Sequence, residues 1–144
     1  MPLTPAPQNC RGFSLLEALV AITIFSLGLL GLVGMQAAAI SSSSDAKYRA
    51  DAAYLANQVI SRIWTDRSNI ASYQHLAAGT ACAPTGTAST YTDLQNWLID
   101  VTNTLPAGTG SVIVDTSTNT VTVRLCWQQP NSGQHIHTAI AQVN

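Results

Sequence analysis

The feature that most constrains this chain is an apolar run long enough to cross a membrane. No charged side chain occurs between Ala18 and Ser44, and residues 18–40 are apolar apart from one threonine, one serine, one glutamine and three glycines. As an α-helix these residues are about 35 Å long, which is enough to cross a hydrocarbon core of about 30 Å. The sequence therefore predicts one membrane-spanning helix near the N-terminus.

A single carboxylate, Glu17, lies at the start of this run. An ionised acid at the edge of an apolar segment is costly unless a cation neutralises it, so such a residue usually marks a function. The alternative is a carboxylate at the level of the lipid headgroups, in contact with water and without a role. The residues that precede Glu17 favour the first interpretation.

Those residues differ from an ordinary secretory signal. A secretory signal peptide is cleaved after its apolar core, whereas here the polar residues 1–12 come first and end in Arg11-Gly12. Cleavage after Gly12 would leave the apolar run in the mature protein, with Phe13 as its new N-terminus. The α-amino cation of Phe13 would then lie one helical turn from Glu17. The cleavage itself would thus supply the carboxylate with a partner.

The string from Arg11 to Glu17, RGFSLLE, resembles the class III signal of type IV pilins and type II secretion pseudopilins. The resemblance implies that a prepilin peptidase cleaves between Gly12 and Phe13 and then methylates the new amino group of Phe13. It also implies that Glu17, the fifth mature residue, acts in assembly by setting the register between subunits.

The continuation from Ser26 to Gln36, SLGLLGLVGMQ, is similar to the PilV minor pilins, also called type IV pilus modification proteins. The implied function is a minor pilin that is incorporated into a type IV pilus or initiates its assembly. The implied partners are the prepilin peptidase, the inner-membrane assembly platform, the major pilin and other minor pilins. The implied location is the inner membrane, with one span and a periplasmic head, and then the pilus on the cell surface. A type II secretion pseudopilin is the alternative, because it shares the N-terminal signal.

The composition agrees with an exported, membrane-anchored protein. Charged residues make up 9% of the chain and the formal net charge is −1, whereas a typical soluble domain has about 25% charged residues. Because no basic surface is indicated, no nucleic-acid partner is expected. No Ser/His/Asp grouping, metal-ligand spacing or glycine-rich phosphate loop occurs. The sequence therefore predicts neither an enzyme nor a cofactor.

Three cysteines divide between the predicted leader and the predicted head. Cys10 belongs to the leader, while Cys82 and Cys126 remain in a periplasmic part, where disulfides form. A disulfide between them would close a loop of about 45 residues and contribute about 4 kcal/mol on the chain-entropy model. Two unconnected thiols are one alternative. A zinc site with His135 and His137 is another, although it lacks a C-x-x-C pair. We favour the disulfide.

Beyond the membrane run, the helix is predicted to continue to about Asn69, because no proline occurs between Pro7 and Pro84. The predicted organisation is a cleaved leader (residues 1–12), a transmembrane and assembly half of the helix (13–44) and a periplasmic head (45–144). The head includes the second half of the helix. Apolar residues recur there near helical spacing and predict one face to be covered: Tyr48, Leu55, Val59, Ile63 and Ile70.

The rest of the head is predicted to cover that face. Residues 77–92 are predicted to be a loop, followed by a short helix from Thr92 with a capping box between Thr92 and Gln95. Strands are predicted over 111–115, 120–127 and 134–143. The fold class is therefore α+β: one long helix against a small three-stranded antiparallel sheet with a short extra helix, which also resembles the pilin layout. The short helix and the middle strand each have an apolar face: Leu94, Trp97, Leu98 and Val101, and Val121, Val123, Leu125 and Trp127.

Overall fold

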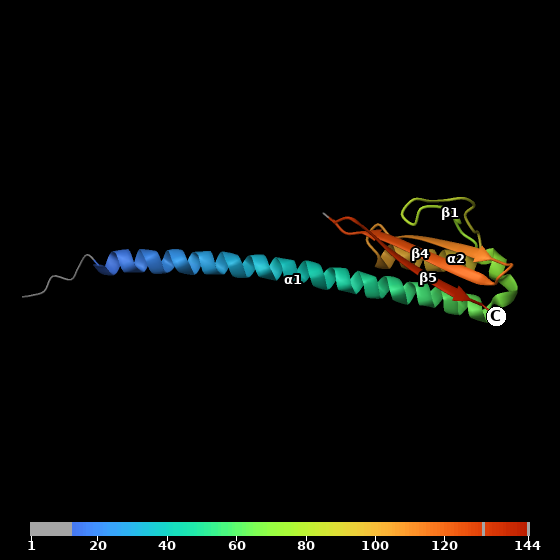
Figure 1. Cartoon of the computed structure of the whole chain (residues 1–144), viewed down its shortest axis with the longest axis horizontal. Coiled ribbons are helices and arrows are strands. Elements are labelled where there is room, and N and C mark those ends of the chain that lie inside the picture. Colours follow the sequence, from blue (N-terminus) through green and yellow to red (C-terminus); the bar gives the residue numbers. More distant parts are fainter. Residues whose placement is uncertain (1–12, 131, 144) are drawn as a thin grey trace, which may run out of the picture. The chain divides into compact units, whose positions relative to one another are not determined.

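The computed structural model describes residues 13–130 and 132–143 of the chain. The chain is divided into two compact units, with the boundary between Ser44 and Asp45. The elements in chain order (Figure 1) are α1 (Phe13–Thr65), the 3-10 helix η1 (Arg67–Tyr73), β1 (Ala78–Gly79), β2 (Pro84–Thr85), α2 (Thr92–Thr104), β3 (Thr109–Asp115), β4 (Thr120–Gln128) and β5 (Gln134–Gln142).

The first unit consists of the N-terminal half of α1. Every side chain from Leu15 to Ser43 is exposed within the single chain. The hydroxyls of Thr23 and Ser26 donate to the carbonyls of the residues four positions earlier, at 2.7 and 2.8 Å, so these polar groups are satisfied without water. By length and composition, α1 contains one segment apolar enough to cross a membrane.

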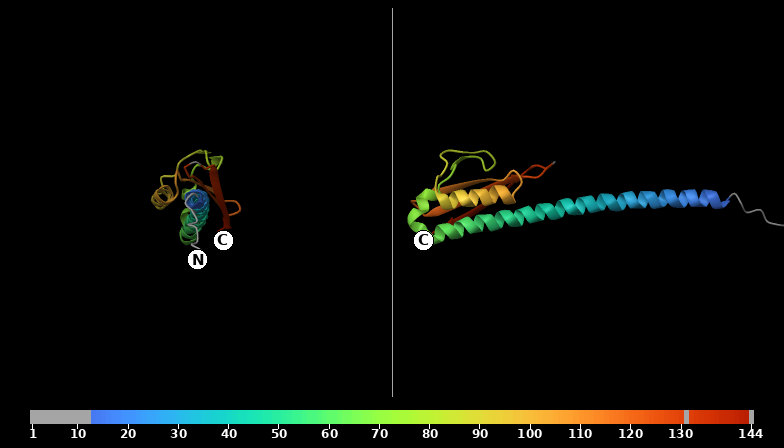
Figure 2. Two further views of the ribbon diagram at one scale, coloured as in Figure 1. Left: turned by 90° about the vertical axis from the view of Figure 1, so that its left-hand side faces the viewer. Right: turned by 180° about the vertical axis from the view of Figure 1, so that it is seen from behind.

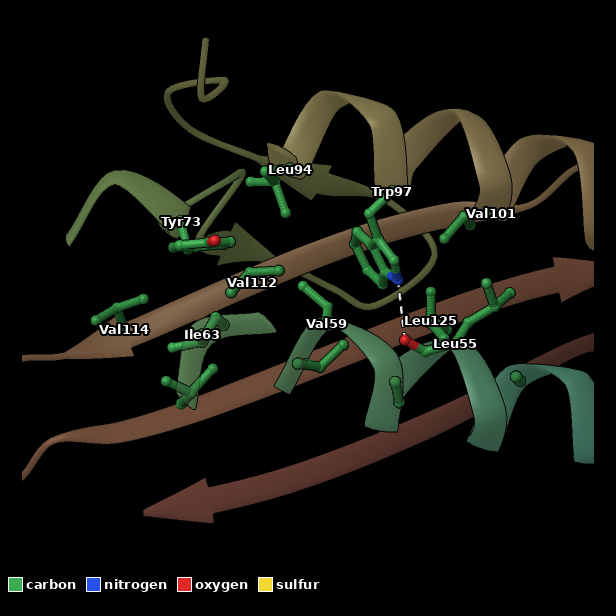
Figure 3. Packing of buried hydrophobic residues seen from close by; sticks show 14 of the residues in the cluster. Leu55, Val59, Ile63, Tyr73, Leu94, Trp97, Val101, Val112, Val114 and Leu125 are labelled. Atoms are coloured by element: carbon green, nitrogen blue, oxygen red, sulfur yellow. Dashed lines mark hydrogen bonds between the residues drawn. The ribbon is translucent and has the colours of Figure 1, made fainter. Parts of the chain in front are cut away.

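The second unit is an α+β head, as the sequence predicts. Residues 45–65 of α1 and helix α2 pack side by side on one face of a sheet with the strand order β3-β4-β5 (Figures 2 and 3). Both strand pairs are antiparallel and continuous in register. The indole nitrogen of Trp97 on α2 donates to the carbonyl of Leu55 on α1 at 2.9 Å and joins the two helices (Figure 3).

The predicted apolar faces form the core of this head. Leu55, Val59 and Ile63 are buried, while Tyr48 and Ile70 pack against the core at its margin. Three of the four predicted residues of α2 are buried, and the fourth, Leu98, is partly buried. The four predicted residues of β4 are all buried. The residues that alternate along β4 and those at helical spacing along α1 and α2 therefore meet in one buried layer, as the sequence predicts.

The long helix ends at Thr65, so the prediction that it continues to about Asn69 is wrong. Asp66 leaves the helical conformation, with φ −122° and ψ 46°, and the chain continues as η1. The carboxylate of Asp66 accepts hydrogen bonds from Tyr73, Tyr91 and Asn69. These three bonds hold η1 and Tyr91, the residue before α2, against the end of α1.

Two further local predictions are wrong. The predicted loop over 77–92 contains a two-stranded hairpin, in which Ala78 pairs with Thr85 and Gly79 with Pro84. The capping box is absent, because the N-cap residue of α2 is Tyr91, whereas Thr92 is already the first helical residue. The side-chain amide of Gln95 instead donates to the carbonyl of Ser89, and the Ser89 hydroxyl accepts a hydrogen bond from the backbone N–H of Tyr91.

Candidate processing and assembly site

The predicted cleavage site falls where the long helix begins. Phe13 is the first residue of α1, whereas Gly12, Arg11 and Cys10 lie outside the described residues. The bond between Gly12 and Phe13 therefore connects the predicted leader directly to the first helical turn. A helix that begins at this bond carries its unpaired N–H groups and the positive end of its dipole at the same place.

Glu17 lies one turn inside the helix. It is four residues from Phe13, which is about 6 Å along the helix axis and on the same side of the helix. The side chain is exposed, and it forms no ion pair within the part of the chain that the structure describes. The carboxylate is therefore open to a partner from outside the chain, in surroundings that are otherwise apolar.

The apolar surface around Glu17 extends over the whole circumference of the helix. Leu15, Leu16 and Leu19 are each more than 60% exposed, and the pattern continues to Ile40 at 68%. A surface helix of a soluble domain has one apolar stripe, whereas a helix that is apolar all round belongs in a membrane or within a bundle. This half of α1 therefore needs lipid or other apolar helices around it.

The two cysteines of the head lie together. Cys82, between β1 and β2, has its sulfur 1.93 Å from that of Cys126 on β4, with the Cα atoms 5.1 Å apart. The side chain of Cys126 points away from the core, because Leu125 and Trp127 on either side of it point inward. A disulfide here attaches the β1–β2 hairpin to the outer face of the sheet.

The alternative zinc grouping is not brought together. His135 and His137 alternate on β5 with the outward-facing residues and therefore lie on the opposite face of the sheet from Cys126. Among the described residues, no group of three or more histidine, cysteine, aspartate or glutamate side chains could hold a metal ion. The structure thus separates the four residues of the zinc alternative.

His135 instead lies in a polar contact that the sequence analysis missed. Its Nδ1 is 3.6 Å from Oδ1 of Asp45, and its ring stacks on Trp127 with the centroids 5.5 Å apart. The other oxygen of Asp45 accepts from Nε of Arg49 at 2.9 Å. His135 is therefore placed between Asp45 and Trp127. No local pattern predicts this contact, because residues 45 and 135 are far apart in the chain.

A second missed cluster surrounds Asp66, at the end of α1. The hydrogen bond from the Tyr91 hydroxyl, followed by the one from the Asn69 amide, holds the pKa of Asp66 below its ordinary value. Burial, followed by the nearby charge of Asp66, raises the pKa of Tyr73. Both shifts arise where the side chains of Tyr73 and Tyr91 join η1 and the start of α2 to Asp66 at the end of α1.

One comparison with known proteins gives a match. The family model described as "Prokaryotic N-terminal methylation motif" matches residues 7–33. No curated protein and no solved structure matches the chain. The match covers the predicted cleavage site, Glu17 and most of the apolar run, but none of the head. The motif indicates a type IV pilin-like N-terminus, of the kind found in the substrates that include type IV pilins and pseudopilins.

Proposed function

We propose that this chain is a minor pilin of a type IV pilus, incorporated into the filament or initiating it after a prepilin peptidase removes residues 1–12. The observation that carries the proposal is the N-terminal half of α1. It begins at Phe13, carries one carboxylate a single turn later, and is apolar on every side as far as Ile40. Such a helix is suited first to a bilayer and then to a bundle of similar helices.

Each part of the chain has its own role in this proposal. Residues 13–44 anchor the subunit in the inner membrane as a single span, and residues 45–144 form the periplasmic head. The head has its own buried core and is therefore ready before assembly. The assembly platform, the major pilin and other minor pilins then provide the surroundings that the apolar helix requires. The PilV-like stretch Ser26–Gln36 favours a minor pilin over a type II secretion pseudopilin.

Glu17 selects the register in which the subunit enters the filament. Its proposed partner is the N-methylated α-amine of Phe13 in a neighbouring subunit. At about 4 Å and an effective dielectric constant near 20, two unit charges attract by about 4 kcal/mol before desolvation is subtracted. The net gain is smaller, but a misplaced subunit leaves the carboxylate unpaired among apolar side chains. The pair therefore penalises wrong registers more strongly than it stabilises the correct one.

Two variants test the two steps separately. Glu17→Ala is expected to be cleaved normally but to be strongly depleted from the filaments, since the charge that sets the register is gone. Gly12→Val is expected to remain as an uncleaved membrane precursor and to be absent from filaments. The measurement is the mass of the chain in membranes and in sheared surface fibres of the same cells.

A matched control is Leu16→Ala, which changes the neighbouring apolar residue and leaves the charge in place, so assembly should be close to normal. Normal assembly of the Gly12→Val chain would contradict the processing step. Equal depletion of the Leu16→Ala and Glu17→Ala chains would contradict the role of the charge. Recovery of the chain only in a secretion filament, with surface pili unaffected by its deletion, would favour the pseudopilin.

A further inference from the structure

The outer edge of β5 has no partner strand within the described part of the chain. β5 is the last strand of the β3-β4-β5 sheet and lies at one margin of the head (Figure 2). It is nine residues long, continuous in register with β4, and contains no acidic or basic residue other than histidine and no proline. Long edge strands of soluble proteins usually carry a charge, a proline or a bulge that blocks further pairing. This strand carries none of them.

The register identifies the residues whose backbone groups point to this edge. Val112 of β3 exchanges both backbone hydrogen bonds with His75, so its groups point away from β4. In an antiparallel ladder the direction alternates from residue to residue. Val123, opposite Val112, therefore bonds toward β5, and its partner Ala139 bonds toward β4. The bond from the Val143 N–H to Asn119 agrees with this alternation.

The even-numbered residues of β5 consequently have backbone N–H and C=O groups at the free edge. Their side chains are all exposed. They read identically in both directions about Thr138, as Gln-Ile-Thr-Ile-Gln: Gln134, Ile136, Thr138, Ile140 and Gln142. An antiparallel copy of this strand centred on Thr138 would therefore match each of these five side chains with its own kind.

The other face of the strand is compatible with the same arrangement. Antiparallel pairing about Thr138 places His135 beside Ala141 of the copy and His137 beside Ala139 of the copy, so each large ring lies next to a methyl group. On the face of the even-numbered residues, exposed Ile136 and Ile140, at 57% and 69%, cover each other across the junction. Apolar and hydroxyl pairs of this kind are favourable across antiparallel strands.

We propose that β5 is a homotypic pairing edge, through which two copies of this chain join antiparallel about a two-fold axis at Thr138. The two three-stranded sheets then form one continuous six-stranded sheet. The interface is isologous, because the same residues contribute from both copies. The occupant is a second copy rather than an unrelated strand, because the self-matching order of side chains coincides with the residues whose backbone groups are free.

The direction of the strand fixes how the two heads meet. β5 runs in the same direction as residues 45–65 of α1 (Figure 1), and its N-terminal end lies beside Asp45. A two-fold axis perpendicular to the sheet therefore reverses this helical segment in the second copy. The edge therefore joins two heads that point in opposite directions. The pairing does not depend on whether the chain enters a type IV pilus or a secretion filament.

Cysteine cross-linking tests the proposal on the full chain in detergent micelles, with Cys10 replaced by serine and the Cys82–Cys126 pair left in place. In the proposed pair the two Thr138 Cα atoms are about 5.5 Å apart, within the range that a disulfide spans. The two Gln134 Cα atoms are about 27 Å apart, eight residues of extended chain. The Thr138→Cys chain should form a disulfide-linked dimer under mild oxidation, and the Gln134→Cys chain, modified on the same exposed face, should not.

Two further variants complete the test. A mixture of Ile136→Cys and Ile140→Cys chains, with different tags, should give the mixed dimer. Adding Ile136→Lys and Ile140→Lys to the Thr138→Cys chain should abolish its dimer, because like charges then meet across the strands. Equal dimer from Thr138→Cys and Gln134→Cys would indicate parallel pairing and overturn the proposal, and absence of dimer from Thr138→Cys would overturn it as well.

Discussion

The two halves of α1 have the same secondary structure but opposite requirements. From Leu15 to Ser43 every side chain is exposed in the single chain, whereas residues 45–65 bury one stripe against α2 and the sheet. The first half has no partner of its own and depends on lipid or on other helices. The second half finds its partners in the same chain. Helix formation alone therefore does not distinguish an anchor from a core element, because the two differ in where the surface that covers the helix comes from.

The largest effect on the head is expected from its central tryptophan. Trp97→Ala should lower the free energy of unfolding by about 3–5 kcal/mol, because Trp97 is fully buried and bonds to Leu55. The measurement is urea denaturation of the full chain in mild detergent, followed by the fluorescence of the remaining tryptophans. Ile99→Ala on the exposed side of α2 is the matched control and should change little.

The same measurement on the membrane half sharpens the comparison. Leu30→Ala should leave the unfolding of the head unchanged, because Leu30 is 70% exposed and is not part of the core. If Leu30→Ala destabilised the head as much as Trp97→Ala does, the two halves would not be independent in the way described.

A smaller effect is expected from the cysteine pair. Replacing Cys82 with serine and Cys126 with alanine should lower the free energy of unfolding by about 2–4 kcal/mol, since the β1–β2 hairpin is then no longer tied to the sheet. The measurement is urea denaturation of the mature protein, with and without a reductant. Reduction should reproduce the effect in the wild-type chain and add nothing in the variant. Unchanged stability in both experiments would favour two unconnected thiols.

Periodicity predicted the parts of the fold that depend on local order. Alternation in β4 and the spacing of Leu94, Trp97 and Val101 in α2 identify the core correctly, because a strand and a helix each place regularly spaced residues on one face. The α+β architecture follows from these faces and from the length of the first helix. The roles of Gly12, Phe13 and Glu17 stay predictions that rest on the motif.

The errors occur where distant residues decide the local structure. The helix ends at Thr65, and the next residue, Asp66, accepts a hydrogen bond from Tyr91, which is 25 residues away in the sequence. The contact of His135 with Asp45 likewise joins the two ends of the head. The hairpin between residues 78 and 85 has strands of only two residues, which are too short to give an alternating pattern.

The smallest expected effect is a pH dependence at Asp66. Hydrogen bonds lower its pKa in the folded head, so the stability it contributes is present above the unfolded value, near pH 4, and is lost as the pH falls through the folded value. Asp66→Asn should therefore flatten the fall in stability with pH below about pH 4. The measurement is the urea midpoint as a function of pH.

Asp51→Asn serves as the control, because Asp51 forms no side-chain hydrogen bond or ion pair among the residues described. Its acid profile should resemble that of the wild-type chain. An Asp66→Asn profile with the full wild-type slope would show that the cluster at the end of α1 does not contribute in this way.

The most direct test of the central claim is the mass of the N-terminus of the chain in assembled surface fibres. Cleavage at Gly12 is central to the proposed function, because it would give Phe13 the free amino group that neutralises Glu17 among apolar helices. We expect a chain that begins with N-methylated Phe13. Fibres that contain the chain with residues 1–12 still attached would contradict it.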